Sequence, residues 1–301
     1  MTAVVVLGSA NMDLVVRQPR LPWPGETIFG SSLTTVAGGK GLNQAVAAAL
    51  AGAQVAFLGA VGRDAFGEAL RRCLNDHAVD TTELVEVDVP TGTAHIAVLD
   101  DGENSIVVVA GANDAVDKLD ERSRDAIRNA EYVVAQLERP TALIAEAFAL
   151  ARANGGRTVL TPAPVSRIAP ELFALVDILI PNSGEACSLT GRDDDTEAAL
   201  ALSLEVGLVV MTRGSRGVVV AQGGDIVADL SARHVEPVDT TGAGDTFAGV
   251  FIARLVLGES LTDALAAAGV AASISVTRPG ASTSMPTWRE IEALLDGHIP
   301  A

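Results

Sequence analysis

The sequence contains few cysteines and few aromatic residues. Cys73 and Cys187 are its only cysteines, and they do not form a C-x-x-C pair. A disulfide framework and a cysteine-based zinc site are therefore excluded, and we expect a reduced, cytoplasmic protein. Aromatic residues make up 3% of the 301 residues, which leaves little to stack on a nucleobase.

Positive charge is also scarce. The chain has 21 Lys and Arg against 38 Asp and Glu, which gives a formal net charge of −17. This balance argues against a nucleic acid or a membrane surface as a partner. Any anionic ligand would have to be held locally, by helix N-termini, Lys40, a few arginines or metal ions.

Long uninterrupted apolar runs are missing as well. Residues 45–62 have the hydropathy of a membrane segment, but they contain Gln54 and are broken at Gly52. A buried helix followed by a strand is the better interpretation. Residues 1–8 lack a basic region and a cleavage site, so we expect no signal peptide.

Short apolar segments alternate with segments of helical periodicity through most of the chain. Buried strands are predicted at residues 3–8, 55–58, 132–137, 157–161, 178–180 and 208–212. Strands that alternate with helices of about 10–15 residues indicate a parallel, doubly wound sheet. With 49% apolar residues, the chain can bury the core of one large α/β domain or two smaller ones.

Two regions interrupt this alternation. Residues 14–36 contain several prolines and glycines and are too broken for the centre of a sheet. Residues 93–99 and 106–109 predict a hairpin. Together these regions predict a small separate sheet, from about 13–36 and 90–111, that forms a lid over the cleft.

Polar residues follow the predicted strands at their carboxyl ends. They are Asn11, Asp13, Glu138, Asn182 and Thr212. Ligands of open α/β sheets bind at this edge. Asn11 and Asp13 point the same way if the chain between them is extended, and could bind the vicinal hydroxyls of a polyol. The alternative is that both residues cap a turn.

Gly242, Ala243, Gly244 and Asp245 precede a helical pattern. We predict that the three small residues open this helix, where free N–H groups and the helix dipole make an anion site. A carboxylate beside a bound anion makes sense if Asp245 takes a proton from a hydroxyl that attacks the anion, as in a kinase. The alternative is that Asp245 only complements the helix dipole.

A glycine-rich turn at residues 38–41 leads into another helix. Its glycines allow a ligand to approach the backbone closely, and Asn43 would lie in the first helical turn. The turn is not a Walker A loop, because Thr34 stands where the first glycine is required. A purely structural turn is the alternative.

In this order the motifs resemble the PfkB carbohydrate kinases, and within that family the ribokinases. The resemblance covers nearly the whole chain and rests on residues 8–13, 38–48, 91–94, 181–186, 212–217 and 239–247. It implies a ribokinase-like three-layer α/β/α sandwich, with a mostly parallel sheet and a small β-sheet lid, formed by residues 1–301 as a single domain. It also implies a homodimer in which the lids of two subunits pack together.

The resemblance implies ATP-dependent phosphorylation of the 5-hydroxyl of D-ribose. By position, Asp245 matches the catalytic base and Gly242, Ala243 and Gly244 match the anion hole. The implied sugar contacts are Asn11, Asp13, Gly39, Lys40, Asn43, Glu138 and Asp245. The implied ATP contacts are Asn182, Thr212, Arg213, Gly214, Ser215, Arg216, Gly217, Gly244 and Gly269.

The resemblance also implies two metal ions. Glu185 matches a residue that acts indirectly on Mg²⁺. A site for an activating monovalent cation, K⁺, is implied mostly through backbone carbonyls, at Asp239, Thr241, Ser275, Arg278, Gly280 and Ser284. Carbonyl and carboxylate oxygens suit an alkali cation better than a transition metal. A turn cap is the alternative role for Asp239.

The chain departs from the family pattern in three places. Thr161 replaces the asparagine that is usual before Pro-Ala-Pro, and Ser183 and Gly184 stand where Glu-Thr is frequent. Gly269 stands near the adenine where His or Asn is frequent. The alternatives to a ribose kinase are a kinase for deoxyribose, fructose or a nucleoside, and a sugar-binding regulator without activity. The scarcity of aromatic residues disfavours the nucleoside, and the presence of Asp245 with its neighbouring glycines disfavours the regulator.

Overall fold

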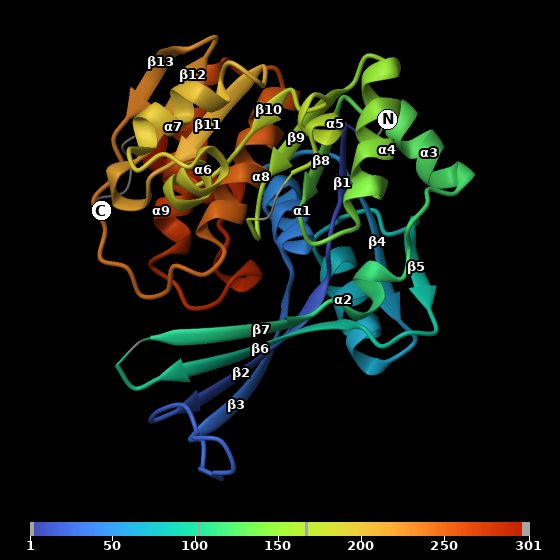
Figure 1. The fold of residues 1–301 in the computed structure, drawn as a ribbon, viewed down its shortest axis with the longest axis vertical. Helices are drawn as coiled ribbons and strands as arrows, with labels where there is room; N and C mark the ends of the chain where they lie inside the picture. The colour runs from blue at the N-terminus through green and yellow to red at the C-terminus, as the bar shows by residue number, and fades with distance from the viewer. Residues whose placement is uncertain (1–2, 102, 166–167, 297–301) are drawn as a thin grey trace.

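The computed structural model describes residues 3–101, 103–165 and 168–296. Within these residues a nine-stranded sheet has the order β13-β12-β11-β10-β9-β8-β1-β4-β5 (Figure 1). Its strands are β1 (Val4–Leu7), β4 (Val55–Gly62), β5 (Leu84–Val87), β8 (Tyr132–Gln136), β9 (Arg157–Thr161), β10 (Ile178–Leu179), β11 (Leu208–Thr212), β12 (Val218–Gln222) and β13 (Asp225–Leu230). Strands β11 through β5 pair in parallel, and the β12–β13 hairpin is antiparallel at one edge.

Helices cover both faces of this sheet. Because side chains alternate along a strand, Val4 and Val6 of β1 join one apolar core while Val5 and Leu7 join another. The first core is covered by α1 (Lys40–Leu50), α2 (Ala65–Asp76), α8 (Ala243–Val256), α9 (Leu261–Ser275) and α10 (Trp288–Leu295). The second is covered by α3 (Glu121–Arg128), α4 (Thr141–Ala153), α5 (Pro170–Phe173), α6 (Ser183–Thr190) and α7 (Asp195–Leu202). The predicted three-layer sandwich is confirmed.

A separate four-stranded sheet projects from the body (Figure 1). It has the order β3-β2-β6-β7, with β2 (Asn11–Gln18), β3 (Ser32–Gly38), β6 (Gly92–Leu99) and β7 (Asn104–Val109). β2 follows β1 after a short connection. Asn11 and Asp13 therefore lie at the beginning of a strand of the small sheet, on one face of it.

Among the described residues, no helix has both the length and the apolar character that crossing a bilayer requires.

Candidate active site

Several of the predicted site residues meet around the amino end of α1. The backbone N–H of Lys40 lies 3.2 Å from a carboxylate oxygen of Glu138, just after β8. Burial lowers the pKa of the Lys40 ammonium, but the carboxylates of Asp245, Glu138, Glu185 and Asp13 outweigh this effect and raise it. One lysine thus shares a site with carboxylates from four distant segments.

Glycines let the backbone of this turn lie against the start of the chain. Gly39 has a φ of +93°, and a Cβ there would lie 2.8 Å from the backbone nitrogen of Asn11. A Cβ on Gly41 would lie 2.5 Å from the Cα of Gly8. The turn at residues 38–41 is therefore structurally required, and the same packing brings Lys40 and Asn43 to the site.

Asp245 lies in the first turn of α8 and is half-buried. The Asn43 side chain donates to its Oδ2 at 3.0 Å, and the Gln44 side chain donates to its Oδ1 at 2.9 Å. Burial raises the pKa of Asp245, while Lys40 and the two amide donors oppose the rise. The result is a carboxylate with a raised proton affinity and a fixed orientation, as a general base requires.

Asp13 lies among like charges. Burial, Glu138 and Asp245 raise its pKa to about 7, and Lys40 opposes the rise. Its carboxylate lies directly over Gly38, where an added Cβ would be 2.2 Å from Oδ2.

Asn11 is 3% exposed and held by a residue that the sequence did not single out. Asn113 donates to its Oδ1 at 2.8 Å and accepts from the backbone N–H of Ala10 at 3.1 Å. Asn113 lies in a short 3₁₀ turn, Gly111–Asp114, after β7. No local motif marks it, because its partners are about a hundred positions earlier.

The amino end of α8 has the features predicted for an anion site. Gly242 is the residue before the helix, has a φ of +73°, and no side chain caps the helix there. The N–H of Ala243 makes a long contact of 3.3 Å with the carbonyl of Thr240. Gly244 is exposed and immediately precedes Asp245, in the first turn of a helix, where the dipole favours a negative charge.

Asn182 and Glu185 form a capping box at the start of α6. The Asn182 side chain accepts from the N–H of Glu185, and the Glu185 carboxylate accepts from the N–H of Asn182, both at 2.8 Å. The described residues include no cluster of three or more His, Cys, Asp or Glu side chains placed for a metal. Mg²⁺ commonly binds through few protein groups together with water and substrate phosphates, so one carboxylate near the site fits an indirect role.

The predicted nucleotide loop follows β11. Residues 214–216 form a 3₁₀ turn. Arg213 is ion-paired with Asp229, and Arg216 with Asp195. Both guanidinium groups thus have an acidic partner within the protein. Gly269 of α9 is next to open space, since a Cβ there would contact nothing within 4 Å.

The predicted cation residues lie in the loop before α8 and in the segment that begins at the end of α9, and a hydrogen-bonded carboxylate joins the two. Asp239 accepts from the N–H of Thr241 and of Gly280, both at 2.9 Å. Burial raises the pKa of Asp239, but these hydrogen bonds outweigh the effect and lower it. The loops therefore fit a hard cation held by carbonyls and one ionised carboxylate.

The side chains of three other predicted cation residues have their own partners. The hydroxyls of Ser275 and Ser284 donate to the carbonyls of Ala272 and Ala281, and Arg278 is ion-paired with Glu290 at 2.6 Å. Ser275 and Arg278 would therefore contribute backbone carbonyls to a cation.

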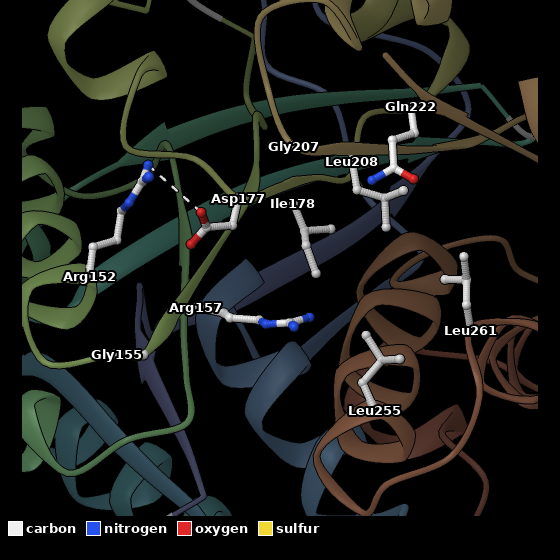
Figure 2. Close-up of a pocket in the computed structure, with 11 residues that line it drawn as sticks. Arg152, Gly155, Arg157, Asp177, Ile178, Gly207, Leu208, Gln222, Leu255 and Leu261 are labelled. Carbon is white, nitrogen blue, oxygen red and sulfur yellow. Dashed lines mark ion pairs between the residues drawn. The ribbon is translucent and has the colours of Figure 1, made fainter. Parts of the chain in front are cut away.

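A cavity of about 570 Å³ lies at the amino ends of β9, β10 and β11, away from their carboxyl ends (Figure 2). It is lined by Arg157, Ile178 and Leu208, among others, and by Arg152 and Asp177, whose charged groups are 3.7 Å apart. None of the predicted site residues lines it. The candidate active site is thus at the carboxyl edge, where the polar residues converge.

Two curated relatives match nearly the full chain. A ribokinase of Haemophilus influenzae is 38% identical over 301 residues and covers 97% of this chain and 98% of its own. A ribokinase of Bacillus subtilis is 40% identical over 297 residues, with 98% and 100% covered. A solved structure of Arabidopsis thaliana ribokinase complexed with ribose and ATP superimposes with a TM-score of 0.92, at 34% identity and with 98% of both chains covered.

The family model described as "pfkB family carbohydrate kinase" matches residues 1–288. This match spans every residue of the site described above. The chain therefore belongs to the pfkB family of carbohydrate kinases.

Proposed function

We propose that the protein is an ATP-dependent ribokinase, which transfers the γ-phosphoryl group of ATP to the 5-hydroxyl of D-ribose. The observation that carries the proposal is Asp245, held by Asn43 and Gln44 beside the uncapped amino end of α8. A positioned base next to an anion site is the arrangement that phosphoryl transfer to a hydroxyl needs. The relatives named ribokinase, one of them solved with ribose and ATP, support ribose as the acceptor.

In the proposed reaction Asp245 accepts the proton of the sugar hydroxyl as its oxygen attacks the γ-phosphorus. The bond from the γ-phosphorus to the bridging oxygen of ADP breaks, and ADP leaves. The N–H groups at residues 242–244 stabilise the charge of the transferred group. Mg²⁺ bound with ATP would neutralise the donor phosphates; Asn182 and Glu185 lie at the edge where the phosphates would bind.

The sugar is assigned to the residues around Lys40. Asn11, Asp13 and Glu138 offer acceptors, and Lys40 and Asn43 offer donors, to the sugar hydroxyls. Asn43 has a buried side-chain oxygen without a partner among the described residues, so a sugar hydroxyl would satisfy it. The backbone of Gly39 completes the site.

We further propose that K⁺ activates the enzyme from the loops joined by Asp239. The ion would bind to the carbonyls of Thr241, Ser275, Arg278 and Gly280, with Asp239 and Ser284. It would orient the N–H groups of residues 242–244 and would not touch the sugar.

The small sheet is assigned as a lid and as the contact of a homodimer. Its edge strand β7 exposes Ile106, Val107, Val108 and Val109, each 49–64% exposed. An exposed apolar edge strand favours association with another sheet. We place the protein in the cytoplasm, in keeping with its two free cysteines.

A coupled assay of ADP release with a panel of pentoses, hexoses and nucleosides tests the function. Release that depends on ribose, with a higher kcat/KM than for deoxyribose, fructose or nucleosides, supports the proposal. If another sugar in the panel has a higher kcat/KM than ribose, that sugar is the acceptor instead. Sugar binding without ADP release would identify a regulator instead of an enzyme.

A further inference from the structure

Behind Asp245 lies a row of buried polar side chains that the reaction as described does not use. Gln44 donates from Nε2 to Asp245 Oδ1 and to Thr161 Oγ1, each at 2.9 Å. Gln136, the last residue of β8, donates to the Oε1 of Gln44 at 2.7 Å. Gln44 is 1% exposed and Gln136 is fully buried.

Burying this row of polar side chains is costly. The Oε1 of Gln136 has no partner among the described residues, and an unsatisfied buried acceptor destabilises the folded state. Val134 and Ala135, which precede Gln136 in β8, are buried apolar residues. Apolar side chains at positions 44 and 136 would avoid this cost, so stability alone does not account for the two glutamines.

The geometry fixes which way the Gln44 amide faces. Its oxygen accepts from Gln136, and its nitrogen therefore points to Asp245 and Thr161. In the reverse orientation the Gln44 oxygen would face a carboxylate, and two acceptors would repel each other.

We propose that Gln44 is a positioning residue for Asp245, and that Gln136 acts through it by holding its amide nitrogen toward the carboxylate. Gln44 connects the base on α8 to strands β8 and β9, so the base keeps its orientation while the substrates exchange. A donor to the ionised carboxylate also favours the charged form that accepts the proton. This inference rests on the proposed kinase reaction.

The charged groups around Asp245 remain the same when either glutamine is replaced by methionine. They are Lys40, Glu138, Asp13 and Glu185. A change in the pH dependence of the variants can therefore be assigned to the lost hydrogen bonds.

The test compares Gln44→Met, Gln136→Met and the double variant in steady-state kinetics between about pH 5 and pH 9. We expect Gln44→Met to lower kcat about 10- to 100-fold, the equivalent of one hydrogen bond to a charged group. The acid limb of its kcat–pH profile should move up by about one pH unit, with the KM for ATP nearly unchanged. Gln136→Met should show the same changes to a smaller extent.

Two further variants sharpen the test. The double variant should be no slower than Gln44→Met, because Gln136 acts only through Gln44. Gln136→Glu should be slower than Gln136→Met, since a carboxylate cannot donate to Gln44 and would turn its amide around. Thr158→Val is the matched control: it removes a buried hydroxyl at the other end of β9, bonded to Leu175 and Asp177.

Thr158→Val should lower the melting temperature without moving the acid limb. If Gln44→Met melts earlier but keeps the kcat and the acid limb of the wild type, the role is purely structural and the inference is overturned. If the wild type itself releases no ADP with any sugar, the proposed function has failed instead.

Discussion

Asp239 accepts a hydrogen bond of 2.9 Å from the backbone N–H of Gly280, 41 positions later in the chain. The same carboxylate accepts from Thr241, three residues before Gly244. The loop that precedes α8 is therefore connected to the turn that follows α9. Any ion held by these loops would act on the N–H groups at the amino end of α8 without contacting the sugar.

The first prediction concerns that ion. We expect KCl to raise kcat strongly, NaCl to do so less, and the sugar KM to change little. Asp239→Ala should abolish the response and leave a low basal rate. The desalted enzyme is assayed in Tris-chloride, NaCl and KCl at equal ionic strength, with Asp225→Ala, an exposed acid on β13, as control. Equal rates in the three salts would exclude a functional cation site.

Asp245→Asn keeps the shape of the base but cannot accept the proton. We expect kcat to fall by at least ~10²-fold, the low end for loss of a general base. Sugar binding, measured by calorimetry, should remain. The substitution also places an amide opposite the donors of Asn43 and Gln44, so melting temperatures are compared first. A turnover close to that of the wild type would refute the assignment of the base.

Asp13→Ala tests the acceptor site. Because Asp13 lies on the small sheet beside Lys40 and Glu138, its loss should raise the sugar KM or prevent saturation. The KM for ATP should stay similar, since the predicted nucleotide loop is on the body. If the sugar KM does not change, Asp13 has only a structural role at the start of β2.

The raised pKa of Asp13 predicts a pH-dependent stability. The pKa is about 7 in the folded protein and about 3.9 in an unfolded chain. Between these values the folded state binds the proton more tightly, so the free energy of unfolding falls as the pH rises. Asp13→Asn removes the titration and should raise the melting temperature more near pH 8 than near pH 5. An equal change at both pH values would contradict this cause.

The proposed dimer contact through the small sheet is tested by placing lysine in β7. Adjacent residues of β7 point to opposite faces, so Ile106→Lys and Val107→Lys are made separately. We expect the wild type to sediment as a dimer and at least one variant as a monomer. Leu204→Lys, at a position that is 72% exposed on the body, is the control. A monomeric wild type, or two variants that remain dimeric, would rule out this contact.

The sequence predicted the sheet well because its signal is local. The run at residues 3–8 is apolar up to its final glycine and matches β1 within a residue, and the β-branched and apolar segment at residues 157–161 matches β9. Asp245 could be proposed from its place after Gly242 and Gly244, since a helix start depends on neighbouring residues.

The contacts that orient the site could not be predicted from the sequence, because they join residues that are far apart in the chain. Gln44 and Asp245 are 201 positions apart, and Asn113 and Asn11 are 102 apart. Such pairs are created by the packing of α1 on α8 and of the turn at residues 111–114 on β2, which no local pattern encodes. Helix α6 is a different case: Asn182 and Glu185 carry a capping-box spacing, which is a local signal for the start of a helix.

Asn11 and Asp13 belong to the small sheet, whereas Asp245 and the nucleotide loop belong to the body. In the proposed site, acceptor recognition would therefore be shared between the small sheet and Lys40, Asn43 and Glu138 of the body, while the base would lie on the body alone. In evolutionary terms the share on the small sheet could diverge separately, since substitutions on β2, β3 and β6 could alter which hydroxyls are bound while α8 stays the same. A laboratory selection for a new acceptor would accordingly begin with the faces of the small sheet.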